Sequence, residues 1–351
     1  MHLPDAVEGV IYDTASISTM HALAAAREVA VPDVRTRGLA GRDLPLLRVY
    51  ASEHAHTSVD KAVIALGLGH NSLRRIPADD NFSMRIDALE AAIVEDHAAG
   101  IRPIAVVATI GTTSSTSVDD VAAVAVIAKQ ENLWMHVDAA YAGVMAMVPE
   151  FEWMRAGLDR ADSIVVNPHK WLFTPFDLSV LFTPRMDVLR QAFSLTPEYL
   201  KTPETGAVKN LMDTGVQLGR RFRALKLWAI LRYFGAEGVR ARLREHCRLA
   251  QLFASWVDAD PDWARVAPVP FSVVCFRAIR QAQGNTDDLD ALNHRIIEYV
   301  NKSGDVFISH TSLNGQIVIR LAIGNLRTEE RHLRRAWDLL REGQRVGHAG
   351  S

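Results

Sequence analysis

The sequence predicts an α/β fold built on a largely parallel sheet, followed by a smaller α+β domain. Three short apolar runs, Pro103 to Thr109, Leu133 to Val137 and Ser163 to Val166, alternate with longer helical patterns. Polar residues follow each run directly. Because open parallel sheets bind ligands at the carboxyl ends of their strands, this pattern predicts a ligand site at that edge.

The helical elements fill the intervals between these strands. Apolar residues at helical spacing predict one helix over Thr19 to Glu28 and another over Val118 to Glu131, with Asp119 and Asp120 in its first turn. The Pro and Gly residues between Thr196 and Gly206 predict a long mobile loop over the site.

The pattern of apolar and polar residues changes after about Trp228. A long amphipathic helix pattern is followed by two short strands, "FSVVCFRA" and "GQIVIRLAIG", and by a last helix from Thr328 onward. We therefore expect a large domain over residues 1–230 and a small C-terminal domain over residues 231–351.

Composition narrows the class of protein. The 351 residues carry a formal net charge of −2, and 48% of them are hydrophobic, which argues against nucleic acid or an anionic membrane as a partner. A small-molecule partner is expected instead. Only two cysteines occur, no apolar run reaches transmembrane length, and no secretory signal is recognisable, so we expect a cytoplasmic protein.

Three other patterns have structural interpretations. A basic cluster lies among apolar residues between Leu218 and Trp228, and we interpret this stretch as one helix with a packed and a solvated face rather than a phosphate patch. His54 and His56 have the spacing of two zinc ligands, but no third ligand follows, so no metal is expected. Cys247 and Cys275 are expected to be buried apolar side chains.

Chemistry-bearing residues gather at the predicted strand ends. Lys170 follows one strand, Asp138 ends another, and Thr112 and Thr113 follow a third, while His56 lies in a histidine-bearing segment. A lysine nucleophile in a desolvated site, a fixed carboxylate, a flat stacking group and phosphate donors are together the requirements of pyridoxal phosphate chemistry.

The motifs at these positions resemble a known family. The chain is similar to the group II pyridoxal-phosphate-dependent amino acid decarboxylases, within them to the aromatic-L-amino-acid decarboxylase branch. The resemblance implies a fold-type-I (aspartate aminotransferase-like) enzyme with a mainly parallel seven-stranded sheet. The motifs that carry it are "SEHAHTSVDKA", "ATIGTT", "HVDAAYAG", "NPHKW", "PEYLK" and "LGRRFRALKLW", in the family's order.

The resemblance also implies roles for the central residues. Lys170 would form the internal aldimine, the Schiff base with pyridoxal 5'-phosphate. Asp138 would pair with the pyridinium nitrogen and keep the ring an electron sink. Ala140 would pack against one face of the ring and His56 against the other.

Other residues would hold the phosphate and move protons. Ala15 and Ser16 stand where a helix begins and offers free N–H groups to an anion, and the resemblance adds Asn167 and His169 as phosphate ligands. Thr113 would lie near the phenolic oxygen of the cofactor or the substrate carboxylate. Tyr199, on the predicted loop, would support protonation of the substrate carbon after decarboxylation.

These residues predict decarboxylation of an L-amino acid, expected to be aromatic, to an amine and CO₂. Family members with phenylalanine in place of Tyr199 tend toward aldehyde formation, so an aldehyde synthase or another lyase on the same scaffold is the alternative enzyme. A homodimer is expected because family sites form between subunits.

One departure from the family leaves a further alternative open. Family members usually carry a long segment before the point that matches Val10, which wraps the partner subunit and forms part of the substrate pocket. Either the sequence begins downstream of the true start, or the chain is a truncated paralogue. The second case admits a catalytically silent, cofactor-binding subunit.

Overall fold

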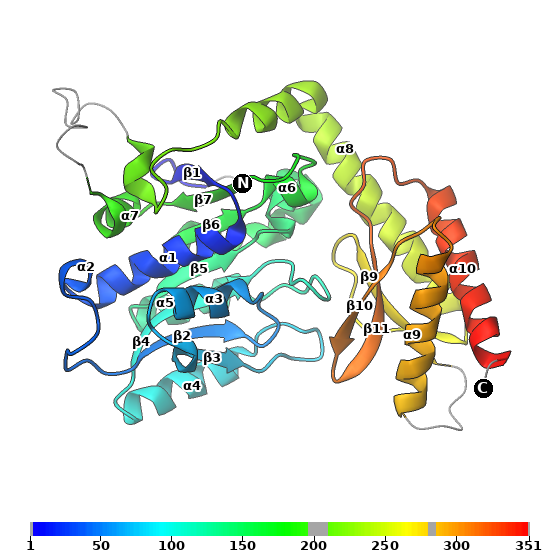
Figure 1. Ribbon diagram of the computed structural model, residues 1–351, viewed down its shortest axis with the longest axis horizontal. Helices are drawn as coiled ribbons and strands as arrows, with labels where there is room; N and C mark the ends of the chain where they lie inside the picture. The colour runs from blue at the N-terminus through cyan, green and yellow to red at the C-terminus, as the bar shows by residue number, and fades with distance from the viewer. Residues whose placement is uncertain (1–2, 196–209, 280–285, 350–351) are drawn as a thin grey trace. The chain divides into compact units, whose positions relative to one another are not determined.

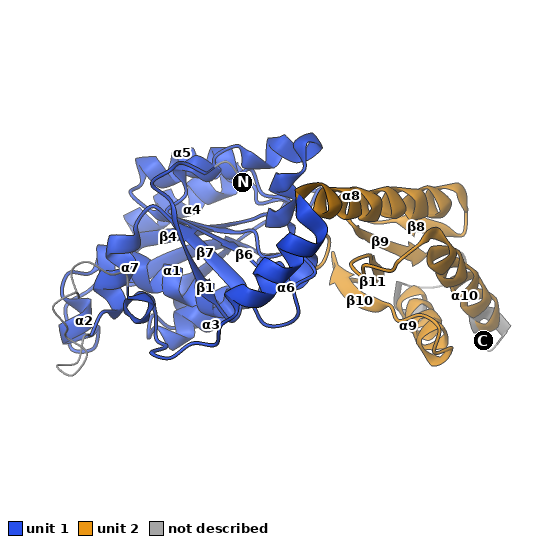
Figure 2. Ribbon diagram, turned by 90° about the horizontal axis from the view of Figure 1, so that it is seen from above, with its two compact units in different colours: residues 1–110, 118–235 blue, residues 111–117, 236–351 orange. Residues whose placement is uncertain are grey.

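The computed structural model describes residues 3–195, 210–279 and 286–349. They form two compact units. The first comprises residues 1–110 and 118–235, and the second comprises residues 111–117 and 236–351 (Figure 2).

A seven-stranded sheet forms the centre of the first unit (Figure 1). Its strands are β1 (Glu8–Tyr12), β2 (Leu47–Ser52), β3 (Leu73–Ile76), β4 (Arg102–Thr109), β5 (Trp134–Asp138), β6 (Ser163–Val166) and β7 (Ser179–Thr183). Their spatial order is β1-β7-β6-β5-β4-β2-β3. The five strands from β3 to β6 in this order pair in parallel, whereas β7 and β1 add antiparallel ladders at one edge. The prediction of a mainly parallel seven-stranded sheet is confirmed.

Helices cover both faces of this sheet, with α1 and α3 on one side and α5 on the other (Figure 2). The longer helices are α1 (Ala15–Ala30), α3 (Ser58–Ala65), α4 (Ile86–Ala98), α5 (Val121–Gln130) and α7 (Met186–Phe193). The short ones are α2 (Val34–Arg37), α6 (Pro168–Trp171), η1 (His70–Ser72), η2 (Ala142–Met147), η3 (Pro149–Arg155), η4 (Leu158–Arg160) and η6 (Leu211–Thr214).

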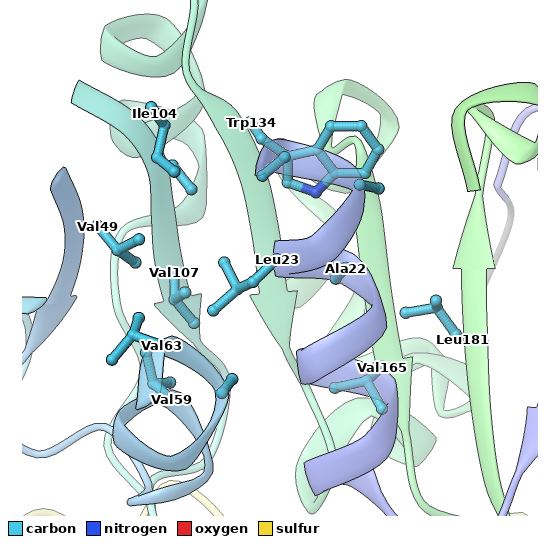
Figure 3. Packing of buried hydrophobic residues seen from close by; sticks show 14 of the residues in the cluster. Ala22, Leu23, Val49, Val59, Val63, Ile104, Val107, Trp134, Val165 and Leu181 are labelled. Carbon is cyan, nitrogen blue, oxygen red and sulfur yellow. The ribbon is translucent and has the colours of Figure 1, made fainter. Parts of the chain in front are cut away.

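The main core of the first unit lies between α1, α3 and the sheet. Leu23 of α1 is fully buried and lies over Val107 of β4, while Val165 and Leu181 continue the apolar surface across β6 and β7 (Figure 3). The inner face of α1 is rich in alanine, and small side chains let a helix approach a sheet closely. This packing fixes where α1 begins, beside the ends of the strands.

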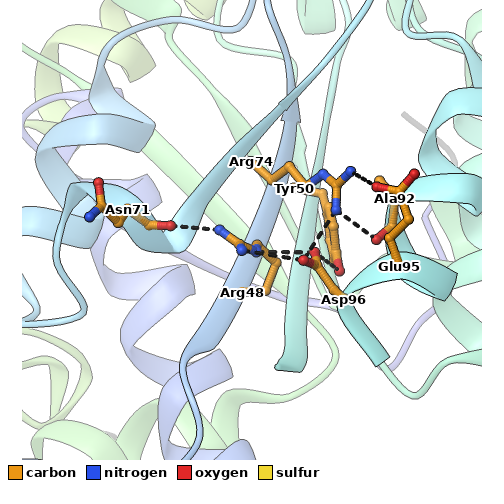
Figure 4. A network of polar contacts seen from close by, with 7 residues as sticks. All are labelled: Arg48, Tyr50, Asn71, Arg74, Ala92, Glu95 and Asp96. Carbon is orange, nitrogen blue, oxygen red and sulfur yellow. Dashed lines mark hydrogen bonds and ion pairs between the residues drawn. The ribbon is translucent and has the colours of Figure 1, made fainter. Parts of the chain in front are cut away.

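An ionic network on the opposite face ties α4 to β2 and β3 (Figure 4). The Asp96 side chain is 4% exposed, and it accepts hydrogen bonds from Arg48 Nε at 3.0 Å and from Tyr50 Oη at 2.8 Å. Arg74 Nη1 lies 3.1 Å from the second Asp96 oxygen, and Arg74 also pairs with Glu95. Several donors around one buried carboxylate satisfy its charge.

Two of the predicted helices begin later than expected. The helix expected from Val118 begins at Val121, because Asp120 caps it and accepts the Ala123 N–H at 2.9 Å. The buried Asp119 is turned away from this helix and accepts the N–H groups of Met84 and Thr109, each at 2.7 Å.

The helix expected from Leu218 begins only at Ala224. Arg220 donates to the carbonyl oxygens of Ile11 at 3.0 Å and Leu211 at 2.7 Å. The segment before the helix is therefore held against β1 by this guanidinium rather than by helical hydrogen bonds.

The second unit has a four-stranded antiparallel sheet in the order β10-β11-β9-β8. Its elements are β8 (Trp263–Arg265), β9 (Val273–Ala278), β10 (Ser309–Leu313), β11 (Gln316–Ala322), α9 (Thr286–Lys302), α10 (Glu330–Ala349) and the later part of α8 (Ala224–Ala259). Gly235, with φ 62°, interrupts α8 where the first unit ends. An aromatic core joins Phe253 to Phe276 at 5.3 Å and Trp263 to Trp337 at 5.3 Å between ring centroids. Within the described ranges, no helix combines the length and apolarity needed to cross a membrane.

Candidate active site

The carboxyl ends of the parallel strands in the first unit bring several predicted residues together. Asp138 is the last residue of β5, in register with Thr109 of β4 and Val165 of β6. The segment Asn167 to Lys170 follows β6 directly, and His56 follows β2 after a short turn. The sheet register thus places a carboxylate between the strand ends that carry the lysine and the histidine.

Buried residues connect Asp138 to the start of α6. Asp138 is only 6% exposed, and its Oδ1 atom accepts the N–H of Ala140 at 3.1 Å. The carbonyl oxygen of Ala140 accepts the N–H of Asn167 at 3.0 Å. Asp138, Ala140 and Asn167 are all buried, so their positions are fixed by packing as well as by these hydrogen bonds.

The side chains of Lys170 and His56, next to these buried residues, are exposed. The lysine backbone is held in the single turn of α6, where its N–H donates to Asn167 O at 2.9 Å. The lysine expected in a desolvated site is therefore exposed in this chain. An exposed amine at the end of a buried strand is accessible to a carbonyl compound.

The charges of Asp138 and Lys170 both reach the ring of His56. Partial burial lowers the pKa of His56, Asp138 opposes this change, and the nearby Lys170 lowers the pKa further. His56 Nδ1 accepts the N–H of Ser58 at 3.0 Å, so the neutral ring carries its proton on Nε2. His56 thus presents a neutral, flat ring beside the lysine and the carboxylate.

His169 has the same arrangement of ring nitrogens. Its Nδ1 atom accepts the N–H of Leu178 at 2.8 Å, which leaves Nε2 as the donor. Burial lowers the pKa of His169, and the positive charge of Lys170 lowers it further. His169 is therefore a neutral hydrogen-bond donor.

The start of α1, where Ala15 and Ser16 were predicted to hold a phosphate, fits an anion. No side chain caps α1, and its first turn contains no acidic residue, so the N–H groups near Ala15 and Ser16 face an uncapped helix end. The amide of Asn167 is 2% exposed, and its Oδ1 atom has no hydrogen-bond partner within the described residues. An amide oxygen only accepts hydrogen bonds, so a ligand that satisfies Oδ1 must present a donor to it, and a phosphate contact would come from the NH₂ of the Asn167 amide instead.

Some predicted residues fall outside this group. Thr113 is exposed in the segment 111–117, which belongs to the second unit. Tyr199 and the expected loop from Thr196 lie outside the described residues. The ring of His54 packs 5.3 Å from that of Phe82, and the described part of the chain holds no group of three or more metal-ligating side chains.

Several groups that shape the site were not predicted from the sequence. The N–H groups of Ser58 and Leu178 set the proton positions of His56 and His169, and backbone groups leave no sequence signal. Tyr141 stacks on Trp171 with the rings 4.9 Å apart and 4° from parallel. Both aromatic residues lie inside the motifs that mark the site, and this was the available signal.

A cavity of about 1050 Å³ in the first unit lies elsewhere. Its lining includes Arg102 and Trp134, which begin β4 and β5, so it opens at the amino ends of the strands. The carboxyl edge, where the lysine, the histidines and Asp138 meet, is the edge at which parallel sheets bind ligands.

Comparisons with known proteins agree with this geometry. Residues 1–279 match the model of the pyridoxal-dependent decarboxylase conserved domain. The chain belongs to the pyridoxal-dependent decarboxylase family. The aromatic-L-amino-acid decarboxylase of Sus scrofa is 40% identical over 338 residues, which are 95% of this chain and 67% of that protein. The phenylacetaldehyde synthase of Arabidopsis thaliana is 38% identical over 338 residues, or 95% and 68%.

A solved structure supports the same assignment. The Oryza sativa TDC determined with PLP and tryptamine superposes with a TM-score of 0.92 and 37% identity, over 97% of this chain and 71% of that one. This decarboxylase thus has the fold of fold-type-I pyridoxal-phosphate enzymes, as the sequence predicted. Its cofactor is pyridoxal 5'-phosphate, and it is an amino acid carboxy-lyase.

Proposed function

We propose that this decarboxylase converts an aromatic L-amino acid to the corresponding amine and CO₂ at the carboxyl edge of its first unit. The observation that carries the proposal is the placement of buried Asp138 at the end of β5, where its charge and that of exposed Lys170 both reach His56. The similarity to an aromatic-L-amino-acid decarboxylase supports the aromatic side chain.

The residues of the first unit divide the work of holding the cofactor. Lys170 would supply the amine that bonds to it, and Asp138 would hold a proton on its ring nitrogen. Ala140 and His56 would bound the two faces of the ring. The N–H groups of Ala15 and Ser16, with His169 and the side-chain amide of Asn167, would bind the phosphate. When bound, pyridoxal phosphate supplies an electron sink for the pair left by CO₂.

The protein contributes orientation and a proton to the reaction. The bond between Cα and the carboxylate would have to stand perpendicular to the ring to break, and buried Asp138, held by packing and by the Ala140 N–H, would keep the ring in a fixed position for this. Tyr199 would donate a proton from its phenol to the substrate Cα, where hydrogen replaces the departed CO₂. The neutral ring of His56 would stack on the cofactor without adding a positive charge next to Lys170.

Covalent capture of the cofactor tests the site. Borohydride reduction of the chain loaded with pyridoxal phosphate is expected to add the cofactor's mass to the peptide containing Lys170, and Lys170→Ala is expected to remove that mass. Attachment at another lysine, or none, would overturn the assignment of Lys170.

Product analysis tests the reaction. Release of CO₂ from carboxyl-labelled tryptophan, tyrosine and phenylalanine, with glutamate as the comparison, is expected to favour an aromatic substrate. A preference for glutamate would contradict the proposal. Cofactor attachment with no CO₂ from any amino acid would instead support a silent, cofactor-binding subunit.

The similarity to a phenylacetaldehyde synthase favours one second candidate, oxidative formation of an aldehyde. That reaction consumes O₂ and releases H₂O₂ and ammonia with the CO₂. We expect amine without H₂O₂, because the sequence has tyrosine at position 199. Aldehyde and H₂O₂ in amounts equal to CO₂ would establish the second candidate.

We further propose that the protein acts as a homodimer. Seven side chains between residues 211 and 233 of the first unit are apolar or aromatic and each at least 53% exposed: Leu211, Val216, Leu218, Phe222, Leu225, Trp228 and Tyr233. Exposed apolar surface of this extent marks an interface, and a second copy is the expected partner. Sedimentation should give a dimer, and Trp228→Glu should shift it toward monomer. A wild-type monomer at micromolar concentration would contradict this proposal.

A cytoplasmic location remains part of the proposal. Both cysteines are free thiols, and burial raises the pKa of Cys247 and of Cys275 to about 12. Such thiols suit a reducing compartment. Fractionation of cells that express the protein, with a cytoplasmic marker, tests the location.

A further inference from the structure

The orientation of His169 depends on a loop rather than on its own helix. His169 and Leu178 form a reciprocal pair, in which Leu178 N–H donates to His169 Nδ1 at 2.8 Å and His169 N–H donates to Leu178 O at 3.4 Å. A backbone N–H can only donate, so this contact keeps Nδ1 unprotonated and Nε2 protonated. Movement of Leu178 away from the ring would remove this constraint and leave either nitrogen of His169 free to carry the proton.

An ion pair fixes the residue next to Leu178. Arg223 Nε lies 2.9 Å from Asp177 Oδ1, and Arg223 Nη2 lies 3.4 Å from Asp177 Oδ2. The Arg223 side chain is only 9% exposed and that of Asp177 is 20% exposed, so water screens the pair weakly. Two parallel contacts from a planar guanidinium restrain both position and rotation of the carboxylate, which a single ammonium cannot do.

Other groups around Asp177 do not replace this restraint. Lys226 Nζ lies 4.0 Å from Asp177 Oδ1, which is the limit of an ion pair and beyond a hydrogen bond. Phe176 lies 4.6 Å from the His169 ring, but its own side chain is 74% exposed. Arg223 is therefore the group whose geometry holds this end of the loop.

We propose that the Arg223–Asp177 pair is a positioning device for His169, which holds the Leu178 N–H against Nδ1 and so directs the Nε2 proton toward a bound phosphate. The inference rests on the proposed role of His169 in holding the cofactor. Arg223 and Asp177 act only through Leu178 and His169.

The test compares variants in apo and loaded protein. Asp177→Asn and Arg223→Gln remove the pair, Arg223→Lys keeps the charge without the two-point contact, and exposed Arg221→Gln is the matched control in the same segment. In apo protein labelled with ¹⁵N-histidine, wild-type His169 should show one protonated and one unprotonated nitrogen. The first two variants should average these two signals, and Arg221→Gln should leave them separate.

Cofactor binding gives the second readout. The dissociation constant of pyridoxal phosphate should rise about tenfold in Asp177→Asn and Arg223→Gln, because one hydrogen bond to a charged group is weakened. Arg223→Lys should give a smaller rise. His169→Gln should bind weakly, and adding Arg223→Gln to it should cause little further loss, because both changes remove the same contact.

The outcomes separate this inference from the proposed function. Thermal unfolding identifies any variant that fails to fold, and Arg223→Lys and Asp177→Asn then carry the test. Unchanged His169 signals in folded variants would overturn the inference even where cofactor affinity falls. The opposite result is also distinguishable. If the His169 signals are separate in the wild type and average in the variants, but the wild type does not bind pyridoxal phosphate, the positioning device is supported and the proposed function is overturned.

Discussion

The Nδ1 atom of His136 on β5 lies 2.9 Å from the Oγ atom of Ser163 on β6, and both side chains are fully buried. Trp134 Nε1 donates to the same hydroxyl oxygen at 2.9 Å, and His136 Nε2 lies 3.3 Å from Thr19 Oγ1 of α1. A buried histidine thus connects α1 with β5, which ends in Asp138, and with β6, which precedes the turn that carries Lys170.

This histidine should make the stability of the protein sensitive to acid. Burial lowers the pKa of His136 to about 4, with partial opposition from Asp138, whereas the unfolded chain titrates near 6.5. Between these values the unfolded state binds more protons, so stability should be full above pH 6.5 and fall as the pH drops toward 4. The expected loss is about 3 kcal/mol.

Urea unfolding at pH 7.5, 5.5 and 4.5 measures this loss. His136→Asn should be less stable at pH 7.5 but should lose less stability on acidification than the wild type. His21 is the matched position for the same comparison, because burial lowers the pKa of its ring to about 4 as well. An equal acid dependence in His136→Asn and wild type would show that His136 does not carry the effect.

The hydrogen bonds and ion pairs of Asp96 should contribute strongly to the stability of the first unit. Asp96→Asn leaves Arg48 and Arg74 without their shared buried carboxylate, which should cost about 3 kcal/mol of unfolding free energy. Glu95→Gln is the control on the same helix, because Glu95 is 66% exposed and its pair with Arg74 should contribute less than about 1 kcal/mol. Denaturant midpoints measure both changes, and equal effects would contradict the expected importance of burial.

Much of the site could be predicted because strand ends leave a strong pattern. The apolar run from Ser163 to Val166 is β6 itself. The polar residues that come directly after this run were therefore correctly placed at the carboxyl end of a strand. The same logic located Asp138 after β5. Parallel strands bury both faces, so their sequences are short, apolar and sharply bounded.

Other features depend on contacts that sequence spacing does not encode. Asp119 was expected in a first helical turn, but it accepts the N–H of Met84, 35 residues away, and burial raises its pKa to about 6. The pair between Arg223 and Asp177 joins residues 46 positions apart. These partners are set by tertiary packing, and local propensity carries no information about them.

The close approach of Gly143 to β6 should be intolerant of a side chain. A Cβ atom at position 143 would lie 2.7 Å from Val166 Cγ2 and 3.0 Å from the Ala139 Cβ. Gly143→Ala should therefore cost about 1–3 kcal/mol by overpacking, and should weaken cofactor binding because Asn167 follows Val166.

Two further variants make the Gly143 prediction specific. Gly219→Ala meets no atom within 4 Å and should be nearly neutral. Adding Val166→Ala to Gly143→Ala removes the clashing methyl groups and should recover part of the stability that Gly143→Ala loses. Thermal melting and cofactor titration measure both, and a double variant no better than the sum of the two single changes would contradict the steric explanation.

Asp138→Asn should separate cofactor attachment from catalysis. The amide keeps the shape of the side chain, and Lys170 remains in place, so borohydride should still fix the cofactor to Lys170. The ring nitrogen would lose the carboxylate that keeps its proton, and the rate of CO₂ release should fall about a hundredfold or more, as when a preorganised electrostatic partner is removed. Asp162→Asn is the control at the opposite end of β6, where Asp162 accepts the N–H of Met135 at 2.8 Å. That change should lower stability while the rate per bound cofactor stays near wild type, whereas equal rates in Asp138→Asn and wild type would remove Asp138 from the catalytic machinery.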